Sequence, residues 1–265
     1  MKKIFTQGIL VLILFFSTWL VLIQVDWMTV FKVHKVADKT EEKLGELLWD
    51  TFKKSEKENI NPFVTSSIDS IVSKICSENG IDKQFIKVHI FDKDEINAFA
   101  LPNGHLLIYS GLVLATDNQE ELSGVICHEI AHIELNHVMK KLIKEIGLSL
   151  LISMTTEQGG SGTIQETAKL LSSTAFDRSL EKEADLKAVE YLVNSKINPE
   201  SFANFLYTLE QNELEAMKYL PWISTHPDSK ERAEYIIDYS KNKRVKNEAI
   251  LSKGTWGKLK EKLKK

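Results

Sequence analysis

The sequence predicts an α+β fold that is predominantly α-helical, with a small β-sheet beside a central helix. Across most of the chain, apolar residues recur at intervals of three and four, as amphipathic helices require. Strand-like apolar runs gather in residues 87–109, where a Pro-Asn-Gly turn separates two of them. The 265 residues are enough for one globular domain with a sizeable core behind a short N-terminal segment.

The N-terminal segment predicts a membrane anchor over residues 1–28. Uncharged, mostly apolar residues run from Ile4 to Val25, a length that lets a helix cross a bilayer. No small-x-small cleavage site follows, which favours an uncleaved anchor; a cleaved signal peptide and a secreted protein are the alternative. Lys2 and Lys3 favour a cytoplasmic N-terminus. We therefore predict a single-pass protein of a bacterial inner membrane, with its domain on the extracytoplasmic side.

One domain is expected over residues 29–240. Two helices, three strands, a long central helix and two further helices are expected in that order, at residues 36–60, 66–79, 87–91, 98–100, 105–109, 118–144, 198–218 and 227–240. Between the central helix and the later ones, the glycine-rich stretch at 159–162 is interpreted as a mobile flap over a cleft or, equally well, as a plain linker.

The central helix carries residues with the spacing of metal ligands. His128 and His132 are four residues apart, so they lie one turn apart on one helix face and can reach a single ion. Glu129 then lies beside the ion, where it can take a proton from water. Five residues alone are a weak signal, because these offsets arise by chance in many chains. His137 is turned away from this face and is a lesser candidate for supporting a ligand.

A third ligand is expected from a later helix. Glu181 and Asp185 are one turn apart and share a face, whereas Glu183 points away. We assign Glu181 to the metal, with Glu183 as the rival, and expect Asp185 to accept a hydrogen bond from a ligand histidine. Taken alone, this charged stretch would be interpreted as a solvated helix face.

These motifs, taken in order, resemble the zinc metallopeptidase family that includes HtpX, the CAAX prenyl proteases, mitochondrial Oma-type proteases and periplasmic BepA-type proteases. The chain departs from some of them, because it has one apolar span rather than several and no helical repeat domain. The matching pieces are Asn97-Ala-Phe-Ala-Leu-Pro-Asn-Gly104, His128-Glu-Ile-Ala-His132, Glu181-Lys-Glu-Ala-Asp185 and Thr225-His-Pro-Asp-Ser-Lys-Glu-Arg232.

The resemblance implies a gluzincin-type zinc metallopeptidase domain with one Zn²⁺ per subunit. It implies that Glu181 and Asp185 are the family's Glu-x-x-x-Asp pair. It also implies that His226 and Arg232 approach the zinc and stabilise the charged intermediate of catalysis. His226 can instead cap the metal and shut the site, or can be a helix N-cap before Pro227.

A substrate peptide is expected to add to the sheet as an extra strand. The strand formed by Asn97, Ala98, Phe99 and Ala100 is our candidate for this contact, because backbone hydrogen bonds bind a peptide with little demand on its sequence. We thus predict a membrane-anchored zinc endopeptidase that hydrolyses polypeptides, in quality control of misfolded envelope proteins. The alternative is a latent or non-proteolytic, chaperone-like zinc-binding protein.

The charge of the chain is nearly balanced, with a formal net charge of −3. Residues 241–265 differ, because this stretch has ten basic residues and two acidic ones. We interpret it as a basic C-terminal tail that either binds anionic lipid or forms a solvated helix. The near-neutral total and the absence of a matching motif argue against nucleic acid as a partner.

Overall fold

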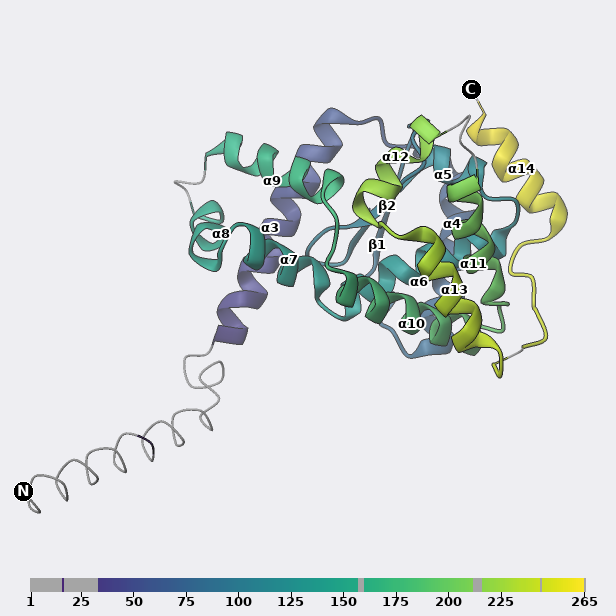
Figure 1. The fold of residues 1–265 in the computed structure, drawn as a ribbon. Helices are drawn as coiled ribbons and strands as arrows, with labels where there is room; N and C mark the ends of the chain where they lie inside the picture. Colours follow the sequence, from purple (N-terminus) through teal and green to yellow (C-terminus); the bar gives the residue numbers. More distant parts are fainter. Residues whose placement is uncertain (1–15, 17–32, 157–159, 212–215, 244, 265) are drawn as a thin grey trace, which may run out of the picture. The chain divides into compact units, whose positions relative to one another are not determined.

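The computed structural model describes residue 16 and residues 33–264, apart from residues 157–159, 212–215 and 244 (Figure 1). The chain divides into two units, Met1–Thr40 and Glu41–Lys265. Helix α3, Val33–Ser55, begins in the first unit and ends in the second. The second unit contains the sheet, the remaining labelled helices and the candidate site.

A three-stranded mixed sheet lies within the second unit. Its strands are β1 (Lys87–Phe91), β2 (Ala98–Ala100) and β3 (His105–Tyr109), in the order β1-β3-β2. β1 pairs with β3 in parallel and β2 pairs with β3 antiparallel. Asn103 and Gly104 have φ values of 62° and 73°, so the Pro-Asn-Gly stretch forms the tight turn between β2 and β3. The predicted sheet is therefore present, with β2 at one edge.

The sheet separates two hydrophobic clusters, because successive side chains of a strand point to opposite faces. Leu106 and Ile108 belong to one cluster with residues of α4 (Pro62–Asn79) and α6 (Gln119–Glu134). Leu107 and Tyr109 belong to the other, with Leu44, Leu48 and Phe52 of α3. Both faces of this small sheet are thus covered by helices.

The remaining helices complete a fold that is mostly helical, as predicted from the sequence. α10 and α11 pack against α6, and α13 packs against both α10 and α11 (Figure 1). The bounds of the remaining helices are α5 Ser110–Ala115, α7 His137–Glu145, α8 Leu148–Met154, α9 Ser161–Ser173, α10 Arg178–Asn194, α11 Glu200–Gln211, α12 Ala216–Thr225, α13 Ser229–Ser240 and α14 Lys253–Leu263.

The predicted central helix over 118–144 is two helices in the structure. α6 ends at Glu134, and Asn136 adopts a left-handed φ of 56° before α7 begins at His137. Asparagine tolerates this conformation better than most residues, so the break is encoded locally, although apolar periodicity continues through it. The predicted helix over 198–218 is likewise replaced by α11 and α12, with residues 212–215 outside the described part.

The predicted location in a membrane is wrong by the structural evidence. Throughout the described ranges, no helix is long and apolar enough to cross a membrane. The longest of them, α3, has 23 residues, but charged residues such as Lys39, Glu42 and Asp50 recur along it. The predicted anchor, residues 1–28, lies outside the described residues except for Phe16.

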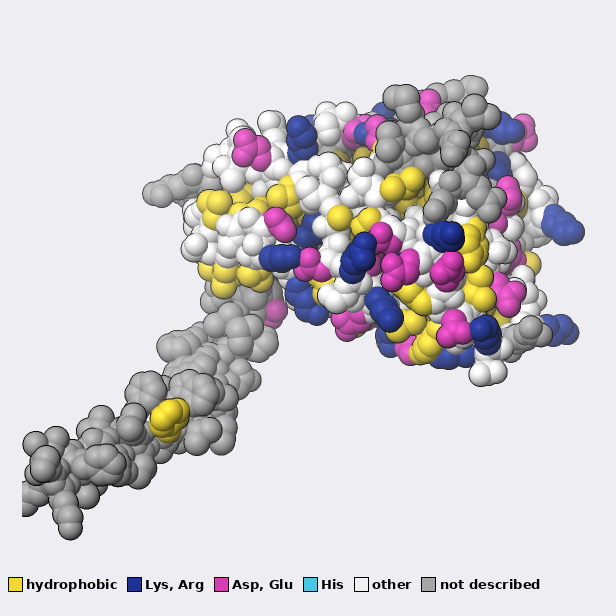
Figure 2. All heavy atoms as spheres, viewed as in Figure 1, with side chains coloured by type: hydrophobic (Ala, Val, Ile, Leu, Met, Phe, Trp, Pro, Cys, Tyr) yellow, Lys and Arg dark blue, Asp and Glu magenta, His cyan; other side chains and the backbone are white. Residues whose placement is uncertain are grey.

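The basic tail contributes part of the folded core. Leu259 and Leu263 of α14 are buried in the cluster that also contains α4. Lys260 donates to the carbonyl of Thr116 at 2.7 Å, and Lys258 lies over the ring of Phe63 at 4.7 Å. Nothing in these contacts supports the predicted binding of anionic lipid. Figure 2 shows acidic and basic side chains interspersed over the visible face.

Gly124 sets the distance between α6 and α11, and we expect its replacement to destabilise the fold. A Cβ at this position would lie 2.5 Å from Cβ of Phe202 on α11. Gly124→Ala should therefore lower the free energy of unfolding by about 1–3 kcal/mol, as overpacking of a core does. Chemical denaturation of the two proteins measures this difference.

Gly257 of α14 is the matched control. A Cβ there would meet nothing within 4 Å, so Gly257→Ala should stabilise the protein by about 0.5–1 kcal/mol through helix propensity. Equal effects of the two substitutions would contradict the close approach of α6 and α11.

Candidate metal centre

Helix α6 fixes three of the side chains at the site. Its N-cap Asn118 accepts a hydrogen bond from the backbone N–H of Glu121 at 2.9 Å. The helix then runs through the core, and His128, Glu129 and His132 are each completely buried. A buried polar triplet on a core helix is costly unless its members have partners, so its surroundings determine what it can do.

Helix α10 brings Glu181 to the same place. The side chain of Glu181 is 3% exposed, and its Oε1 lies 3.3 Å from Nε2 of His132. Glu183, the rival candidate, has a side chain that is 52% exposed and directs Oε2 toward Nε2 of His137 at 3.3 Å. The structure thus brings Glu181 to the two histidines and leaves Glu183 outside the cluster.

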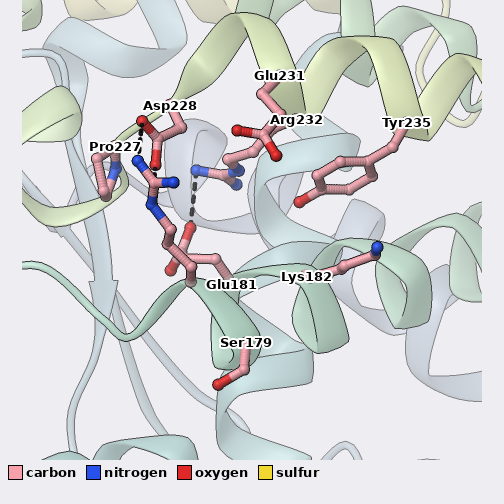
Figure 3. A pocket seen from close by; sticks show the side chains of 9 residues that line it. Ser179, Glu181, Lys182, Pro227, Asp228, Glu231, Arg232 and Tyr235 are labelled. Atoms are coloured by element: carbon pink, nitrogen blue, oxygen red, sulfur yellow. Dashed lines mark hydrogen bonds and ion pairs between the residues drawn. The ribbon is translucent and has the colours of Figure 1, made fainter.

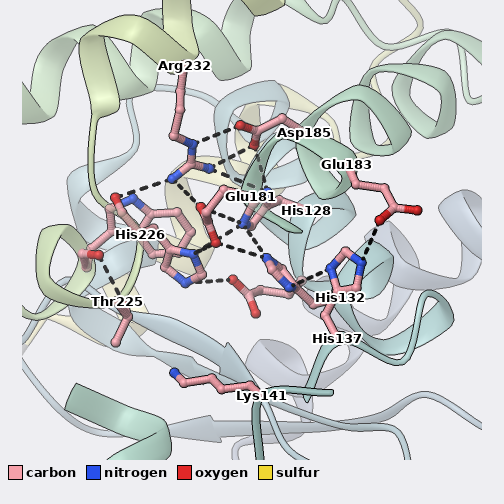
Figure 4. Close-up of polar contacts among 12 residues, drawn as sticks. His128, His132, His137, Lys141, Glu181, Glu183, Asp185, Thr225, His226 and Arg232 are labelled. Atoms are coloured by element: carbon pink, nitrogen blue, oxygen red, sulfur yellow. Dashed lines mark hydrogen bonds and ion pairs between the residues drawn. The ribbon is translucent and has the colours of Figure 1, made fainter. Parts of the chain in front are cut away.

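A third histidine, His226, joins them from the connection between α12 and α13. Its Nδ1 lies 3.0 Å from Oε1 of Glu181 and 3.2 Å from Nε2 of His128 (Figure 4). His128 and His132 bring their Nε2 atoms to 3.0 Å from each other. One ligand atom from each of the four residues lies within 4.8 Å of the others, and all four residues are buried.

The chemistry of these four donors fits a cation at their centre. Asp185 Oδ1 lies 2.8 Å from His128 Nδ1, which places the ring proton on Nδ1 and turns the lone pair of Nε2 toward the cluster. Nε2 of His132 and Nδ1 of His226 approach the same space. Lone pairs that face one another at this distance repel unless a proton or a metal ion lies between them.

Arg232 holds the carboxylates of the cluster. Its Nε donates to Asp185 Oδ2 and its Nη2 to Asp185 Oδ1, both at 2.8 Å. Nη1 lies 2.8 Å from Glu181 Oε2 and 3.3 Å from the carbonyl oxygen of His226. The Tyr235 hydroxyl donates a further short hydrogen bond to Asp185. The guanidinium therefore spans α13, α10 and the segment that carries His226.

Burial and charge set the protonation states. Burial lowers the pKa of His128, His132 and His226 to about 4 each, so these rings are neutral near pH 7 and free to bind a metal. Burial alone would raise the pKa of Glu181, but the charge of Arg232 and a hydrogen bond with His132 outweigh it and hold that pKa well below its usual range.

Glu129 is in a different electrostatic environment. Burial, followed by the charge of Glu181, raises the pKa of its carboxyl well above the usual value. A hydrogen bond from the backbone of Ala100 acts in the opposite direction on this pKa, and Oε1 of Glu129 lies 3.3 Å from Nε2 of His226. A carboxylate with a raised pKa beside a metal-binding cluster is suited to accept and return a proton.

A small cavity of about 230 Å³ lies behind the cluster, between α10 and α13 (Figure 3). Glu181 and Arg232 line it, together with Tyr235 and the ion pair between Arg178 and Asp228. The cavity is on the side where Arg232 holds the two carboxylates. The N-cap of α13 is Asp228, so the interpretation of His226 as the helix N-cap is wrong.

The strand residues predicted to bind substrate form the sheet edge next to α6. Tyr109 donates to the carbonyl of Asn97, and Leu101 donates to the carbonyl of His105. Because antiparallel strands alternate, Ala98 and Ala100 direct their backbone groups away from β3. Asn97, Ala98, Phe99 and Ala100 are all buried.

Two aromatic residues at the site escaped the sequence analysis, and His137, named there as a lesser candidate, lies closer to the site than expected. The Phe176 ring lies 4.1 Å from that of His132, and the Trp222 ring lies 4.2 Å from that of His226. His137 brings Nδ1 to 3.2 Å from Nδ1 of His132. The break at Asn136 turns His137 toward the site, which the assumption of one straight helix concealed.

A helix with the His-Glu-x-x-His sequence, a glutamate from a second helix and a small sheet beside them define a metallopeptidase domain. The sequence profile described as peptidase family M48 matches residues 62–239, well over half of the chain. The chain belongs to this family. The resemblance inferred from the four motifs is thereby confirmed.

Three relatives illustrate the similarity. The beta-barrel assembly-enhancing protease of Yersinia pestis is 27% identical over 63% of this chain and 37% of its own length. The mitochondrial metalloendopeptidase OMA1 of Bos taurus is 30% identical over 56% of this chain and 31% of its own length. Metalloprotease LoiP of Escherichia coli is 30% identical over 60% of this chain and 65% of its own length. The chain thus spans less than two thirds of the length of these relatives.

The two neighbouring glutamates of α10 offer a direct test of the cluster. Glu181→Gln should weaken metal binding by more than about 100-fold, because loss of a ligand should exceed the 10–100-fold effect of losing a supporting residue. Glu183→Gln, on the exposed side of the same helix, should weaken affinity far less, because Glu183 reaches the cluster only through His137. Metal titration of both purified variants measures the difference; equal affinities would contradict the placement of Glu181 in the cluster.

Proposed function

We propose that this protein is a zinc-dependent endopeptidase in which His128, His132 and Glu181 hold the metal. The observation that carries the proposal is the buried convergence of these three side chains, with Glu129 beside them. Membership of a peptidase family supports the same reaction class. Three protein ligands are what a catalytic zinc requires.

The spacing of the donor atoms supports zinc as the metal. Zinc binds imidazole nitrogen at about 2.0–2.1 Å in a tetrahedron, which separates neighbouring ligand atoms by about 3.3 Å. The separations are 3.0 Å between the Nε2 atoms of His128 and His132, and 3.3 Å between His132 Nε2 and Glu181 Oε1. When bound, zinc supplies Lewis-acid polarisation of a peptide carbonyl and activation of water.

Glu129 is the proposed general base and acid. Its carboxylate takes a proton from the water whose oxygen attacks the carbonyl carbon of the peptide bond. It then delivers that proton to the leaving nitrogen as the C–N bond breaks. Burial raises its pKa, which is the direction that makes a carboxylate a stronger base.

His226 and Arg232 are proposed to act at the charged intermediate through different routes. Nε2 of His226 lies on the side of Glu129, where it can donate to a developing oxyanion. The donors of Arg232 are directed to Asp185, Glu181 and the His226 carbonyl, so we propose that it supports the intermediate by holding these groups in place. Asp185 is proposed to orient His128 through Nδ1.

The peptide substrate is proposed to lie along β2. Ala98 and Ala100 direct their backbone groups away from β3 at the edge of the sheet, toward the side where the Ala100 backbone meets Glu129, and this supports addition of an extended peptide there. Recognition through backbone groups places little demand on side chains, so substrates of varied sequence are expected. Quality control of misfolded proteins is a role compatible with this tolerance.

The position of His226 also favours a second candidate, a latent zinc-binding protein. Nδ1 of His226 lies as close to the ligand atoms as they lie to one another. A fourth protein ligand closes a zinc site, whereas a catalytic site keeps one position for water. Such a protein would bind unfolded chains without cleaving them.

Glu129→Gln should abolish hydrolysis of casein while zinc remains bound. The amide cannot accept the proton, and we expect a loss of at least about 100-fold in kcat from the missing acid–base step. Glu134→Gln, an exposed change at the end of the same helix, should retain activity. Casein hydrolysis at the wild-type rate by Glu129→Gln would show that the assigned base is wrong.

Removal of the metal separates the two candidate functions. An active peptidase should digest casein, lose this activity to a chelator such as 1,10-phenanthroline and recover it on addition of Zn²⁺. A latent protein should bind Zn²⁺ and leave casein intact in every condition.

A further inference from the structure

Lys141 of α7 is a buried cation close to the metal centre. Lys141 is 4% exposed. Among the described residues, its ammonium forms no ion pair with a carboxylate. Burial lowers its pKa to about 8, so the group still carries its charge near pH 7. An ammonium kept charged away from water is costly, and it is retained where a specific contact compensates.

Two contacts fix the position of this ammonium, and both belong to the segment between α9 and α10. Nζ donates a short hydrogen bond to the carbonyl of Thr174, the C-cap residue of α9, where the helix dipole favours a positive charge. Nζ also lies over the ring of Phe176, 4.3 Å from its centroid. Lys141 therefore ties α7 to residues 174–176.

Phe176 carries this connection to the metal ligands. Its ring centroid lies 4.1 Å from that of His132 and 5.9 Å from that of His226. Its backbone N–H donates to the carbonyl of Thr225 at 3.2 Å, directly before His226. Phe176 is 6% exposed, whereas both histidines are completely buried, so its ring forms part of the layer over them.

We propose that Lys141 is a positioning residue for the metal centre, which acts by holding the Phe176 ring against His132 and His226. The ring limits the rotation of the two imidazoles and keeps solvent and competing ligands away from the cluster. Figure 4 shows Lys141 on the side of the cluster opposite Arg232. Arg232 holds the carboxylates and Lys141 holds the layer over the histidines.

The test is the rate at which zinc leaves the full-length protein for a chromophoric chelator, which requires no peptidase activity. Lys141→Met keeps the length and apolar character of the side chain and removes the charge. We expect zinc release to become roughly 10-fold faster or more, in line with the loss of other groups that support ligands. Lys140→Met, on the exposed neighbour in α7, should release zinc at the wild-type rate.

Phe176→Leu tests the same contact from the other side, whether or not Lys141→Met folds. It should accelerate zinc release to a similar extent. Zinc release from the double variant should be no more than about twice as fast as from the quicker single variant, because both changes break the same connection. The absorption spectrum of Co²⁺-loaded protein should also change in both variants, since it reports ligand geometry. A role limited to stability would lower the melting temperature and leave this spectrum unaltered.

Wild-type release rates in Phe176→Leu would overturn the proposal, as would rate increases that multiply in the double variant. The inference rests on the proposed zinc site, but different results would refute the zinc site and the role of Lys141. If the wild-type protein binds no metal, the zinc site itself is refuted and the inference falls with it. If the wild-type protein binds zinc and the variants release it unchanged, the inference alone is wrong.

Discussion

The ion pairs of Arg232 with Glu181 and Asp185 are the interaction on which the rest of the site depends. The guanidinium of Arg232 compensates the charges of both buried carboxylates. Asp185 in turn orients His128 through the Nδ1 atom of that histidine. Removing one partner of such a group leaves uncompensated charge in the core, which typically costs about 3–5 kcal/mol. The same contacts join α10 to α13. A change that disturbs the charges of the site therefore also disturbs the packing of these two helices.

These ion pairs explain why a histidine-rich cluster can persist in a dry interior. Burial keeps the imidazoles neutral, while Arg232 keeps Glu181 ionised. The site therefore presents neutral nitrogen ligands and one ionised carboxylate. A divalent ion binds ligands in these deprotonated states. Glu129, which Arg232 does not contact directly, is left with a raised pKa next to these ligands. Two glutamates of one site are thereby given different protonation behaviour by their surroundings.

The sequence predicted the parts of this arrangement that depend on local spacing. The four-residue interval places His128 and His132 on one face of α6, and the same interval places Glu181 and Asp185 together on α10. The small sheet followed from its Pro-Asn-Gly turn, and β2 and β3 flank that turn in the structure. Membership of the peptidase family was predicted from four short motifs in order, none of which is decisive alone.

The remaining features depend on contacts between distant segments. The ring of Phe176 meets His132, and Lys141 meets Phe176, because α9 returns the chain to α7. The orientation of His137 depends on the left-handed backbone of Asn136, and the apolar periodicity of the sequence does not predict that conformation. The membrane location was inferred from the N-terminal composition, and the described helices do not support it.

We expect one zinc ion to lie between α6 and α10. Anomalous diffraction from zinc-loaded crystals, recorded on both sides of the zinc absorption edge, measures this most directly. We expect one peak within about 2.0–2.2 Å of Nε2 of His128, Nε2 of His132 and a carboxylate oxygen of Glu181. A peak bound to other residues, or no peak in protein that has been loaded with zinc, would contradict the account.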